Sequence, residues 1–415
     1  MRIAVVGSGI AGLGSAWLLS RHHEVVLFEA DDRLGGHTHT HDIWHEDRPY
    51  AIDSGFIVHN AENYPLLTRL FQELGVATHA TQMGFSVHDE RNGLQYNASH
   101  LNGLFCQRRN LFSLRFWGML RDIARFYRQA PDLLGLTSDG PTLGDYLEAH
   151  QFGAMFIHDH LVPMASALWS SPSERVLQFP AKYMVQFMAN HHMLQAGGRP
   201  AWRVVSGGSK RYVRALESAW SVQVRLATPV RQVARTENAV VLDTDQGRET
   251  FDQVVLACHS DQALRLLAAP SEREHAILGA IRYQPNDTVL HTDARLLPPN
   301  RRAWAAWNAY VPSDPNEACT VSYCMNLLQG VTSNAPFVVT LNRSHAIDPA
   351  RIIARMRYAH PEYTHASVAA RARRSEINGV DRVWFCGAYW GWGFHEDGLR
   401  SAADVAEALG ARWGS

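Results

Sequence analysis

Three glycines near the start of the chain have the spacing of a phosphate-binding turn. Gly7, Gly9 and Gly12 form the pattern G-x-G-x-x-G directly after the apolar run Arg2–Val6. Gly7 permits a tight turn, Gly9 lets the backbone approach a pyrophosphate, and Gly12 lets the next helix pack closely on the strand. Glu29 lies 22 residues after Gly7, where an acid can bind ribose hydroxyls and disfavours a 2′-phosphate. The pattern therefore predicts a site for FAD or NAD rather than NADP.

Three histidines follow the turn in an alternating pattern. His37, His39 and His41 would share one face of a strand, a spacing that can bind a metal ion. No nearby acid or cysteine completes such a ligand set, so we predict no metal site.

The glycine turn lies between elements that would hold it in place. We expect a buried parallel strand at Arg2–Val6, a helix over 10–20 and a second strand over 24–29. The helix N-terminus would then face the phosphates. The 18 residues from Ile3 to Ser20 carry no charge and alone would suit a signal peptide or a short membrane span. Their glycine spacing favours the nucleotide-binding turn instead.

Further glycine-containing segments are spread along the chain. They are Asp31–Gly36, Asp53–Phe56, 205–208, 383–387 and 393–403. In this order they resemble the FAD-dependent superfamily of amine oxidases and phytoene-type desaturases, at both ends and in the middle of the chain. The resemblance implies that FAD is the cofactor, and that 222–233 is a strand whose backbone at Val230 meets the adenine.

The resemblance also implies a fold class, which is α/β with a Rossmann-type FAD-binding domain interleaved with an α+β substrate domain. Residues 1–65, 200–265 and 375–415 would form the FAD-binding domain, and residues 66–199 and 266–374 the substrate domain. The chain length of 415 residues agrees, because it exceeds the usual size of one domain. In the substrate domain we expect a helix over 64–75 and strands over 288–292, 303–310, 319–326 and 337–342.

The resemblance assigns residues to the site. The expected cofactor-binding residues are Gly7, Gly9, Ile10, Ala11, Gly12, Glu29, Ala30, Arg33, Gly35, Gly36, His37, Thr38, Asp53, Gly55, Phe56, Val230, Gly387, Glu396, Asp397, Gly398 and Ser401. Two positions depart from the family, which usually has arginine in place of His37 and an acid in place of Ala388. We interpret His37 and His395 as candidate catalytic residues near the flavin. The alternative for His37 is a structural hydrogen bond to loop backbone.

Aromatic residues are the candidates for lining the substrate site. They are Trp307, Tyr323, Tyr389, Trp390 and Trp392. In related amine oxidases, aromatic residues at the C-terminal glycine turn form a cage against the flavin, which suits a cationic amine. The alternative is ordinary core packing, since tryptophan is often largely buried.

Two segments narrow the resemblance to a subgroup. Gly-Gly-His-Thr-His-Thr at 35–40 and Tyr-Trp-Gly-Trp-Gly-Phe-His-Glu-Asp-Gly at 389–398 are closest to a bacterial subgroup of NAD/FAD-binding proteins. That subgroup resembles flavoproteins that accompany cyclopropane-synthase-type lipid methyltransferases and desaturate methylated fatty acyl chains. It implies an FAD-dependent oxidoreductase acting on a lipid acyl chain, with a lipid methyltransferase as a partner. The alternatives are a flavin amine oxidase and a non-catalytic, flavin-bound partner of such a methyltransferase.

One amphipathic helix is expected over 111–129. A turn of about 100° per residue puts Arg121, Arg125 and Arg128 on one side, with Trp117 beside them. The other side carries Phe112, Phe116, Met119, Ile123 and Phe126. A basic face with a tryptophan suits a helix on a membrane surface. A helix packed on its own domain with solvated arginines is the alternative.

Composition excludes several classes of protein. The 39 Lys+Arg nearly balance the 40 Asp+Glu, so no overall basic charge points to nucleic acid. The five cysteines are odd in number and lack C-x-x-C spacing, which argues against a disulfide framework and fits a reducing compartment. We therefore expect a cytoplasmic protein that contacts the inner face of the membrane through the arginine helix.

Overall fold

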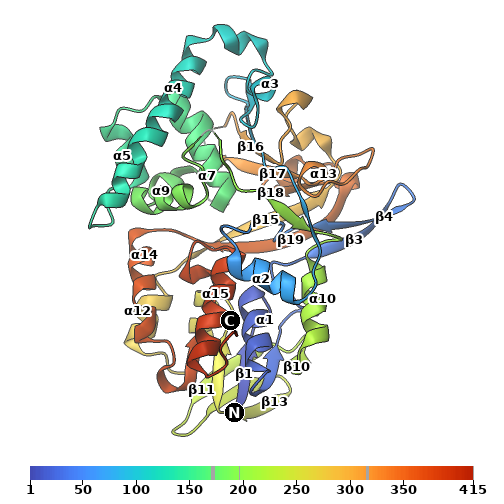
Figure 1. The fold of residues 1–415 in the computed structure, drawn as a ribbon, viewed down its shortest axis with the longest axis vertical. Coiled ribbons are helices and arrows are strands. Elements are labelled where there is room, and N and C mark those ends of the chain that lie inside the picture. Colours follow the sequence, from blue (N-terminus) through green and yellow to red (C-terminus); the bar gives the residue numbers. More distant parts are fainter. Residues whose placement is uncertain (170–172, 196, 315–316, 415) are drawn as a thin grey trace.

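A five-stranded parallel sheet brings three distant parts of the chain together. In spatial order its strands are β10 (Val222–Arg225), β2 (Glu24–Phe28), β1 (Arg2–Val6), β14 (Gln253–Leu256) and β20 (Val383–Phe385). The structure, a computed structural model, describes residues 1–169, 173–195, 197–314 and 317–414. This sheet and both chain termini lie in the same half of the molecule, at the bottom of Figure 1.

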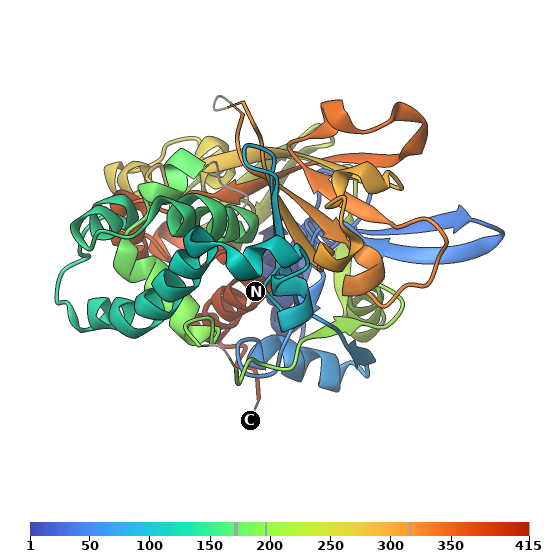
Figure 2. The same cartoon turned by 90° about the horizontal axis from the view of Figure 1, so that it is seen from above.

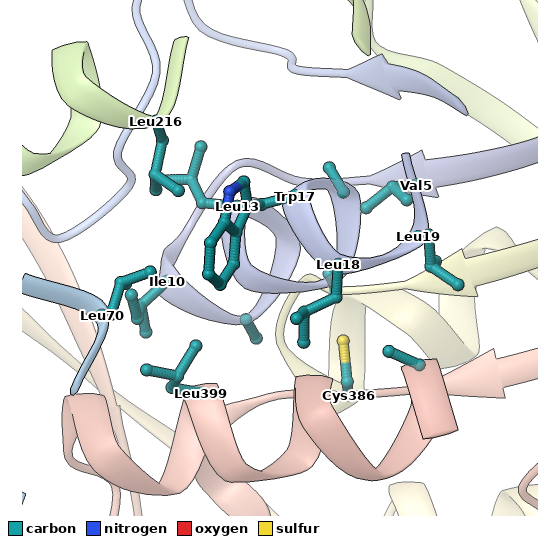
Figure 3. Close-up of a cluster of buried hydrophobic side chains, with 14 of the residues drawn as sticks. Val5, Ile10, Leu13, Trp17, Leu18, Leu19, Leu70, Leu216, Cys386 and Leu399 are labelled. Atoms are coloured by element: carbon teal, nitrogen blue, oxygen red, sulfur yellow. The ribbon is translucent and has the colours of Figure 1, made fainter. Parts of the chain in front are cut away.

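The helix after β1 forms the centre of this lobe. Every residue of α1 (Ile10–Leu19) is buried, as expected for a helix that is apolar all round. α15 (His395–Ala408) runs alongside α1, and side chains such as Leu399, Leu70 and Leu216 from other elements surround it (Figure 3). The uncharged run at the start of the chain is therefore a buried strand, a turn and a core helix.

The single strand expected over 222–233 is wrong. β10 ends at Arg225, β11 (Val230–Arg235) begins at Val230, and the two strands belong to different sheets. Between them Ala227 has a φ of 47°, and Pro229 has no N–H to donate. The backbone N–H groups of Ala227 and Thr228 donate instead to the carbonyls of Asp31 and Glu29, so the crossing lies beside the end of β2.

Shorter elements complete this half of the molecule. β11, β12 (Val240–Thr244) and β13 (Gly247–Phe251) form an antiparallel sheet. The helices are α2 (Pro65–Glu73), α10 (Lys210–Ala219), α11 (Ser260–Leu266), α12 (Glu272–Leu278) and α14 (His365–Ala372). A small sheet joins β5 (Val58–His59), β9 (Arg203–Val205) and β6 (Thr78–Ala80), and the hairpin of β3 (Thr40–His45) and β4 (Arg48–Asp53) projects to one side (Figure 2).

A seven-stranded sheet forms the second half together with a group of helices. Its order is β19 (Ile352–Pro361), β15 (Tyr283–His291), β18 (Val338–Leu341), β17 (Thr320–Cys324), β16 (Trp307–Val311), β7 (Phe85–Asp89) and β8 (Leu94–Asn97). The four strands expected from the sequence all lie in this sheet. β7, β8 and the edge strand β19 were not expected; in β19 the exposed Arg355 and Arg357 alternate with less exposed residues.

The helices of the second half lie on one side of it and the strands on the other (Figure 2). They are α3 (Leu101–Leu104), α4 (Leu114–Gln129), α5 (Leu143–Ala149), α6 (Ala154–Phe156), α7 (Val162–Trp169), α8 (Ser173–Leu177) and α9 (Ala181–Asn190), and α13 (Met325–Leu328) follows β17. The architecture confirms an α/β nucleotide-binding fold combined with an α+β part. The exact domain boundaries stay a prediction.

The helix expected over 111–129 begins later, at Leu114. Its Phe116, Met119 and Phe126 are buried as expected. The expectation for Phe112 is wrong, because this residue precedes the helix and its side chain is 88% exposed. Arg125 does not lie free on a basic face either: its guanidinium lies over the Phe152 ring and donates to the carbonyl of Gln151.

Candidate active site

One continuous cavity of about 1560 Å³ is lined by both halves of the molecule. The turn after β1, the end of β2 and the residues after β14 line one end. Side chains from α4, α7, α9, β16 and β17 line the other end. The cavity therefore lies where the carboxyl ends of the parallel strands meet the second half, the usual ligand position in such sheets.

The glycine turn provides a backbone surface at the first end. A Cβ on Gly12 would lie 1.8 Å from the carbonyl oxygen of Gly7, so only glycine lets α1 pack this closely. A Cβ on Gly9 would meet no protein atom within 4 Å, because Gly9 faces the cavity. The free N–H groups and positive dipole end of α1 are thus open to a negatively charged group.

The second glycine pair packs directly on the first turn. Gly36 has a φ of 55°, and a Cβ there would lie 3.1 Å from the Cα of Gly9. Arg33 holds this loop by donating to the carbonyl oxygens of Gly36, at 2.8 Å, and Thr38, at 3.1 Å. Two segments that are far apart in the sequence thus form one phosphate-sized cradle.

Glu29 lies at the end of β2 and lines the same part of the cavity. Its carboxylate accepts hydrogen bonds from the backbone N–H groups of Ser8, at 2.8 Å, and Asp31, at 2.9 Å. Ala30 and Val230 line the wall nearby. An acid in this position can accept hydrogen bonds from the two ribose hydroxyls of an adenosine.

The structure divides the expected cofactor-binding residues into two groups. Those that line the cavity are Gly7, Gly9, Ile10, Ala11, Glu29, Ala30, Arg33, Gly36, His37, Gly55, Phe56, Val230 and Gly387. Those that do not line it are Gly12, Gly35, Thr38, Asp53, Glu396, Asp397, Gly398 and Ser401. The residues of the second group lie outside the cavity and contact the segments that form its wall.

Three acidic residues of the second group are bound by the protein itself. Glu396 accepts from the N–H groups of Leu66 and Leu67, at 3.0 Å each, and so holds the first turn of α2. Asp397 accepts from the N–H groups of Trp392 and Phe394 and fixes the C-terminal glycine turn. Neither carboxylate faces the cavity, which corrects their assignment as direct cofactor ligands.

Asp53 is the third acid and is fully buried. It accepts hydrogen bonds from Ser209, Thr40 and Gln329. Burial raises the pKa of Asp53 to about 6, and the hydrogen bonds it accepts oppose this rise. Asp53 therefore ties β4 to the start of α10 and to the loop after α13, and it acts by positioning the wall.

Ser401 and Thr38 also act from behind the wall. Ser401 accepts from the N–H of Gly387 at 2.8 Å and donates to the carbonyl of Gly398. Thr38 is hydrogen-bonded to Tyr212 and, at 3.0 Å, to Nε2 of His395. Gly398 lets α15 approach α1, because a Cβ there would lie 2.7 Å from Ile10.

Both candidate catalytic histidines line the cavity. His395 stacks on Phe56 with 3.8 Å between ring centres, and its Nε2 is hydrogen-bonded to Thr38. Its position is therefore fixed by the protein. Nε2 of His37 is buried without a hydrogen-bond partner among the described residues. His37 thus retains an unpaired polar atom in the wall of the cavity.

A cluster of histidines around His37 was not expected. The ring of His37 lies 5.9 Å from His259 and 5.5 Å from His360, and 4.9 Å from Tyr358. These residues come from the loop between β2 and β3, the segment between β14 and α11, and β19, so no sequence spacing links them. The surplus of histidines in the composition was the only available signal. Seven of the 22 line the cavity, namely His37, His39, His160, His191, His259, His360 and His395.

Burial keeps these histidines uncharged at neutral pH. It lowers the pKa of His395 and His39 to about 3, and that of His160, His191 and His360 to about 4. The pKa of His37 is also well below its usual value, because of burial and the neighbouring His360 and His259. The histidines thus supply polar, neutral groups to the wall and no positive charge.

The second end of the cavity is a mainly apolar arm. Representative lining side chains are Phe85, Leu120, Ile123, Met164, Leu168 and Phe187. Trp307 and Tyr323 also line it, as expected, and their rings pack edge to face at 5.3 Å. The only carboxylates among the described lining residues are Glu29, Asp31 and Asp32, at the nucleotide end.

The aromatic turn near the C-terminus is divided between the cavity and the core. Tyr389 and Trp392 line the cavity. Trp390 does not: it packs on the core of the first half, donates to the carbonyl of Phe385, and lies under the guanidinium of Arg374. The assignment of Trp390 as a substrate-lining residue is therefore wrong, and no cage of Trp390 and Trp392 forms.

The residues present fit a flavin dinucleotide. The open backbone cradle at Gly9, the acid at the end of β2 and the unpaired Nε2 of His37 lie along one cavity. Among the described residues, no group of three His, Cys, Asp or Glu side chains could hold a metal ion. Within the same residues, no helix is both long and apolar enough to cross a membrane.

Sequence comparison finds a protein family and curated relatives for this chain. Residues 10–296 match the family described as flavin containing amine oxidoreductase. AofH of Mycobacterium tuberculosis, which is described as a flavin-containing monoamine oxidase, is 25% identical over 270 residues, or 61% of this chain and 56% of its own. The chain thus spans about half the length of this curated relative.

Solved structures share the fold at low identity. Putrescine oxidase bound to putrescine superposes with a TM-score of 0.71 at 14% identity, covering 99% of this chain and 100% of its own. A fatty acid isomerase from P. acnes superposes with a TM-score of 0.70 at 13% identity, covering 98% of both chains. The family match covers more than half of the sequence, so the cofactor of this protein is a flavin. The chain belongs to the flavin-containing amine oxidoreductase family.

Proposed function

We propose that the protein is an FAD-dependent oxidoreductase that desaturates an acyl chain of a lipid, including a methylated one. The observation that carries the proposal is the apolar arm that continues from the nucleotide end of the cavity. No carboxylate among the described residues lines this arm, and its histidines are neutral at pH 7. Such a wall suits a hydrocarbon chain, whereas a buried ammonium group would lack a counter-charge.

A bound flavin would supply the hydride acceptor for such a desaturation. The protein must bind the acyl chain, orient it and exclude water. Trp307, Tyr323 and Trp392 line the arm and would fix the chain by apolar contact. His37 lies in the wall with its unpaired Nε2 and is the group we assign to hydrogen-bond at the flavin. His395 is held by Thr38 and Phe56 and would support that wall.

The amine oxidase alternative is favoured by the family description and by the positions of Tyr389 and Trp392 on the cavity. The apolar arm disfavours it, because no carboxylate among its described lining residues could serve as the counter-charge of a buried ammonium group. A cytoplasmic location and partnership with a lipid methyltransferase also remain proposals. The five free cysteines support the former, and the resemblance to the methyltransferase-associated subgroup supports the latter.

Anaerobic mixing tests the substrate class. The yellow protein is mixed with phospholipids that carry methylated acyl chains and, separately, with putrescine and cyclohexylamine, and flavin absorbance is followed. Bleaching by lipid alone supports the proposal, and bleaching by amine alone overturns it. Bound flavin that neither substrate reduces supports the non-catalytic partner.

A matched pair of variants locates the binding site. Leu168→Glu places a charge in the apolar arm, and Leu226→Glu places one on the surface, where Leu226 is 40% exposed. Leu168→Glu should slow lipid-dependent bleaching at least about tenfold, because a buried carboxylate is strongly unfavourable beside a hydrocarbon chain. Leu226→Glu should leave the rate unchanged. Equal rates in the two variants would contradict binding in this arm.

A further inference from the structure

Exposed apolar side chains gather at one end of the molecule. Five of the 13 exposed large hydrophobic residues lie between 101 and 117: Leu101 at 76% exposure, Leu111 at 42%, Phe112 and Leu114 at 88%, and Trp117 at 48%. We name this surface the α3–α4 tip. It belongs to the end of the molecule that lies opposite β11 and β13 in Figure 1. Single exposed apolar residues are ordinary, but a contiguous group marks an interaction site.

The tip is held in a defined shape. The Trp117 ring packs on Phe105 at 5.6 Å, and its indole N–H donates to the carbonyl of Leu111 at 2.9 Å. Ser113 caps α4 by accepting from the N–H of Phe116. These contacts fix the backbone of the α3–α4 tip, so its apolar side chains point outward from an ordered turn.

Positive charge surrounds the tip. Residues 93–131 contain six arginines and one acid, Asp122, a net charge of 6 − 1 = +5 in a chain whose net charge is −1. Asp122 is buried and accepts from the N–H of Gly153. Arg108, Arg109 and Arg115 are exposed and form no ion pair with any described residue. Exposed arginines around apolar side chains match anionic lipid headgroups above a hydrocarbon layer.

An apolar stripe connects the tip with the cavity. Leu114, Trp117, Leu120 and Ile123 follow one another at intervals of three residues, each about 60° round the helix from the one before, so the stripe winds from one side of α4 to the other. Leu114 and Trp117 are exposed, whereas Leu120 and Ile123 line the cavity. In α3, the exposed Leu101 and the cavity-lining Leu104 repeat the same relation.

We infer that the α3–α4 tip docks on an anionic lipid bilayer and that acyl chains pass along the Leu114–Ile123 stripe into the apolar arm. The docking itself stands on exposure and charge alone. The passage of an acyl chain rests on the proposed function. The docking surface also differs from the arginine face expected from the sequence, because Arg125 packs on Phe152 while Phe112 and Leu114 point outward.

A second copy of this chain fits the tip less well. In a two-fold interface the same surfaces meet, so two patches that each carry the exposed Arg108, Arg109 and Arg115 would face each other. A bilayer that contains phosphatidylglycerol supplies both the opposite charge and an apolar interior. The occupant of the tip is therefore a lipid surface.

Vesicle sedimentation of the flavin-loaded protein tests the docking. Wild type should sediment with vesicles of phosphatidylcholine and phosphatidylglycerol, and less with phosphatidylcholine alone. The double variant Phe112→Ser/Leu114→Ser should lower the partition coefficient at least about tenfold, because each side chain buries apolar area in the bilayer. Trp44→Ser is the matched control, since Trp44 is 72% exposed on the β3–β4 hairpin, and it should bind as wild type.

Charge is tested separately. The triple variant Arg109→Gln/Arg115→Gln/Arg121→Gln should weaken binding to the anionic vesicles about fivefold for each arginine removed. The control Arg248→Gln/Arg351→Gln/Arg412→Gln removes the same charge from exposed sites elsewhere and should have little effect. Unchanged binding of the double apolar variant, or no binding of wild type to anionic vesicles, would overturn the docking. A wild-type dimer that the apolar variant converts to monomers would overturn it as well.

Flavin reduction distinguishes this inference from the proposed function. With lipid in vesicles, the apolar double variant should bleach at least about tenfold more slowly than wild type. With the same lipid in detergent micelles, the two proteins should bleach equally. Equal slowing in both forms would refute the passage along the tip, and absence of bleaching in either form with intact vesicle binding would refute the proposed function alone.

Discussion

Gly9 and Gly12 belong to one motif, but the structure predicts that alanine acts differently at the two positions. Gly9 has φ and ψ of −63° and 177°, which alanine adopts without strain. Its added Cβ would meet no protein atom within 4 Å and would project into the cavity. The Cβ of Gly12→Ala would lie 1.8 Å from the carbonyl oxygen of Gly7 and 2.9 Å from its carbon, so the turn must move.

The sizes of the two effects follow from these contacts. Gly9→Ala keeps a phosphate away from the N-terminus of α1, and losing one or two charge-assisted hydrogen bonds costs about 3 kcal/mol, or roughly 100-fold in flavin affinity. Its effect on the flavin-free protein should be about 1 kcal/mol or less, the cost of alanine at an N-cap. Gly12→Ala forces a clash worth about 1–3 kcal/mol, although alanine elsewhere in a helix gains about 1 kcal/mol over glycine.

Two measurements separate the variants. The dissociation constant of FAD is titrated with flavin-free protein, and the melting temperature is measured without FAD. Gly9→Ala should lose affinity at nearly unchanged Tm, whereas Gly12→Ala should lose Tm by several degrees as well. Gly118→Ala in α4, where a Cβ also meets nothing within 4 Å, should keep FAD affinity. Wild-type affinity in Gly9→Ala would refute the assignment of this end of the cavity to the pyrophosphate.

Three further predictions concern stability and the site wall. Acidification should destabilise the protein, because burial lowers the pKa of His160, His191 and His291 to about 4 while the unfolded value is about 6.5. Between pH 7 and pH 5 each histidine should lower the free energy of unfolding, measured by urea titration, by about 2 kcal/mol, and protonation of Asp53, whose pKa burial raises to about 6, should offset about 1 kcal/mol of the sum. A flat profile would contradict the burial of the three histidines. Glu396→Ala leaves the N–H groups of Leu66 and Leu67 without their acceptor. Thermal unfolding should show a fold destabilised by about 2–4 kcal/mol, and the folded protein should still bind FAD at the wild-type stoichiometry. Loss of FAD without a change in Tm would show that Glu396 contacts the cofactor directly. Trp390→Phe should lower Tm without changing how the rate of flavin reduction depends on substrate concentration, because Trp390 packs on the core. A change in that concentration dependence would place the Trp390 ring at the substrate.

The local motifs could be predicted because their residues are neighbours in the sequence. The phosphate cradle is specified within residues 2–29 by a strand, a glycine turn, a helix and an acid. Steric contacts at Gly7, Gly9 and Gly12 set its geometry. The strands of the larger sheet were partly visible as apolar runs between turn residues. β19 was not, because an edge strand with exposed arginines lacks an apolar run.

Orientation could not be predicted from residue type. Glu396 and Asp397 stand at a position typical of cofactor ligands, yet backbone N–H groups of α2 and of the glycine turn use their oxygens. Trp390 and Trp392 are two residues apart, yet the partly buried Trp390 packs against the core of the first half whereas Trp392 lines the cavity. Whether such a side chain binds the cofactor or the protein's own backbone depends on packing between elements that are distant in the sequence.

The sequence by itself determined the nucleotide-binding turn, because the turn depends on local backbone conformation at its glycines. The flavin cofactor and the α/β fold were implied by the resemblance of its motifs to a known family. Only the tertiary structure decided which histidines surround the flavin end: His37, His259 and His360 meet although more than 100 residues separate each from the next along the chain. It also decided that Phe112 and Leu114 face outward while Leu120 and Ile123 face the cavity. These assignments depend on which surfaces the rest of the chain covers, and no local pattern contains that information.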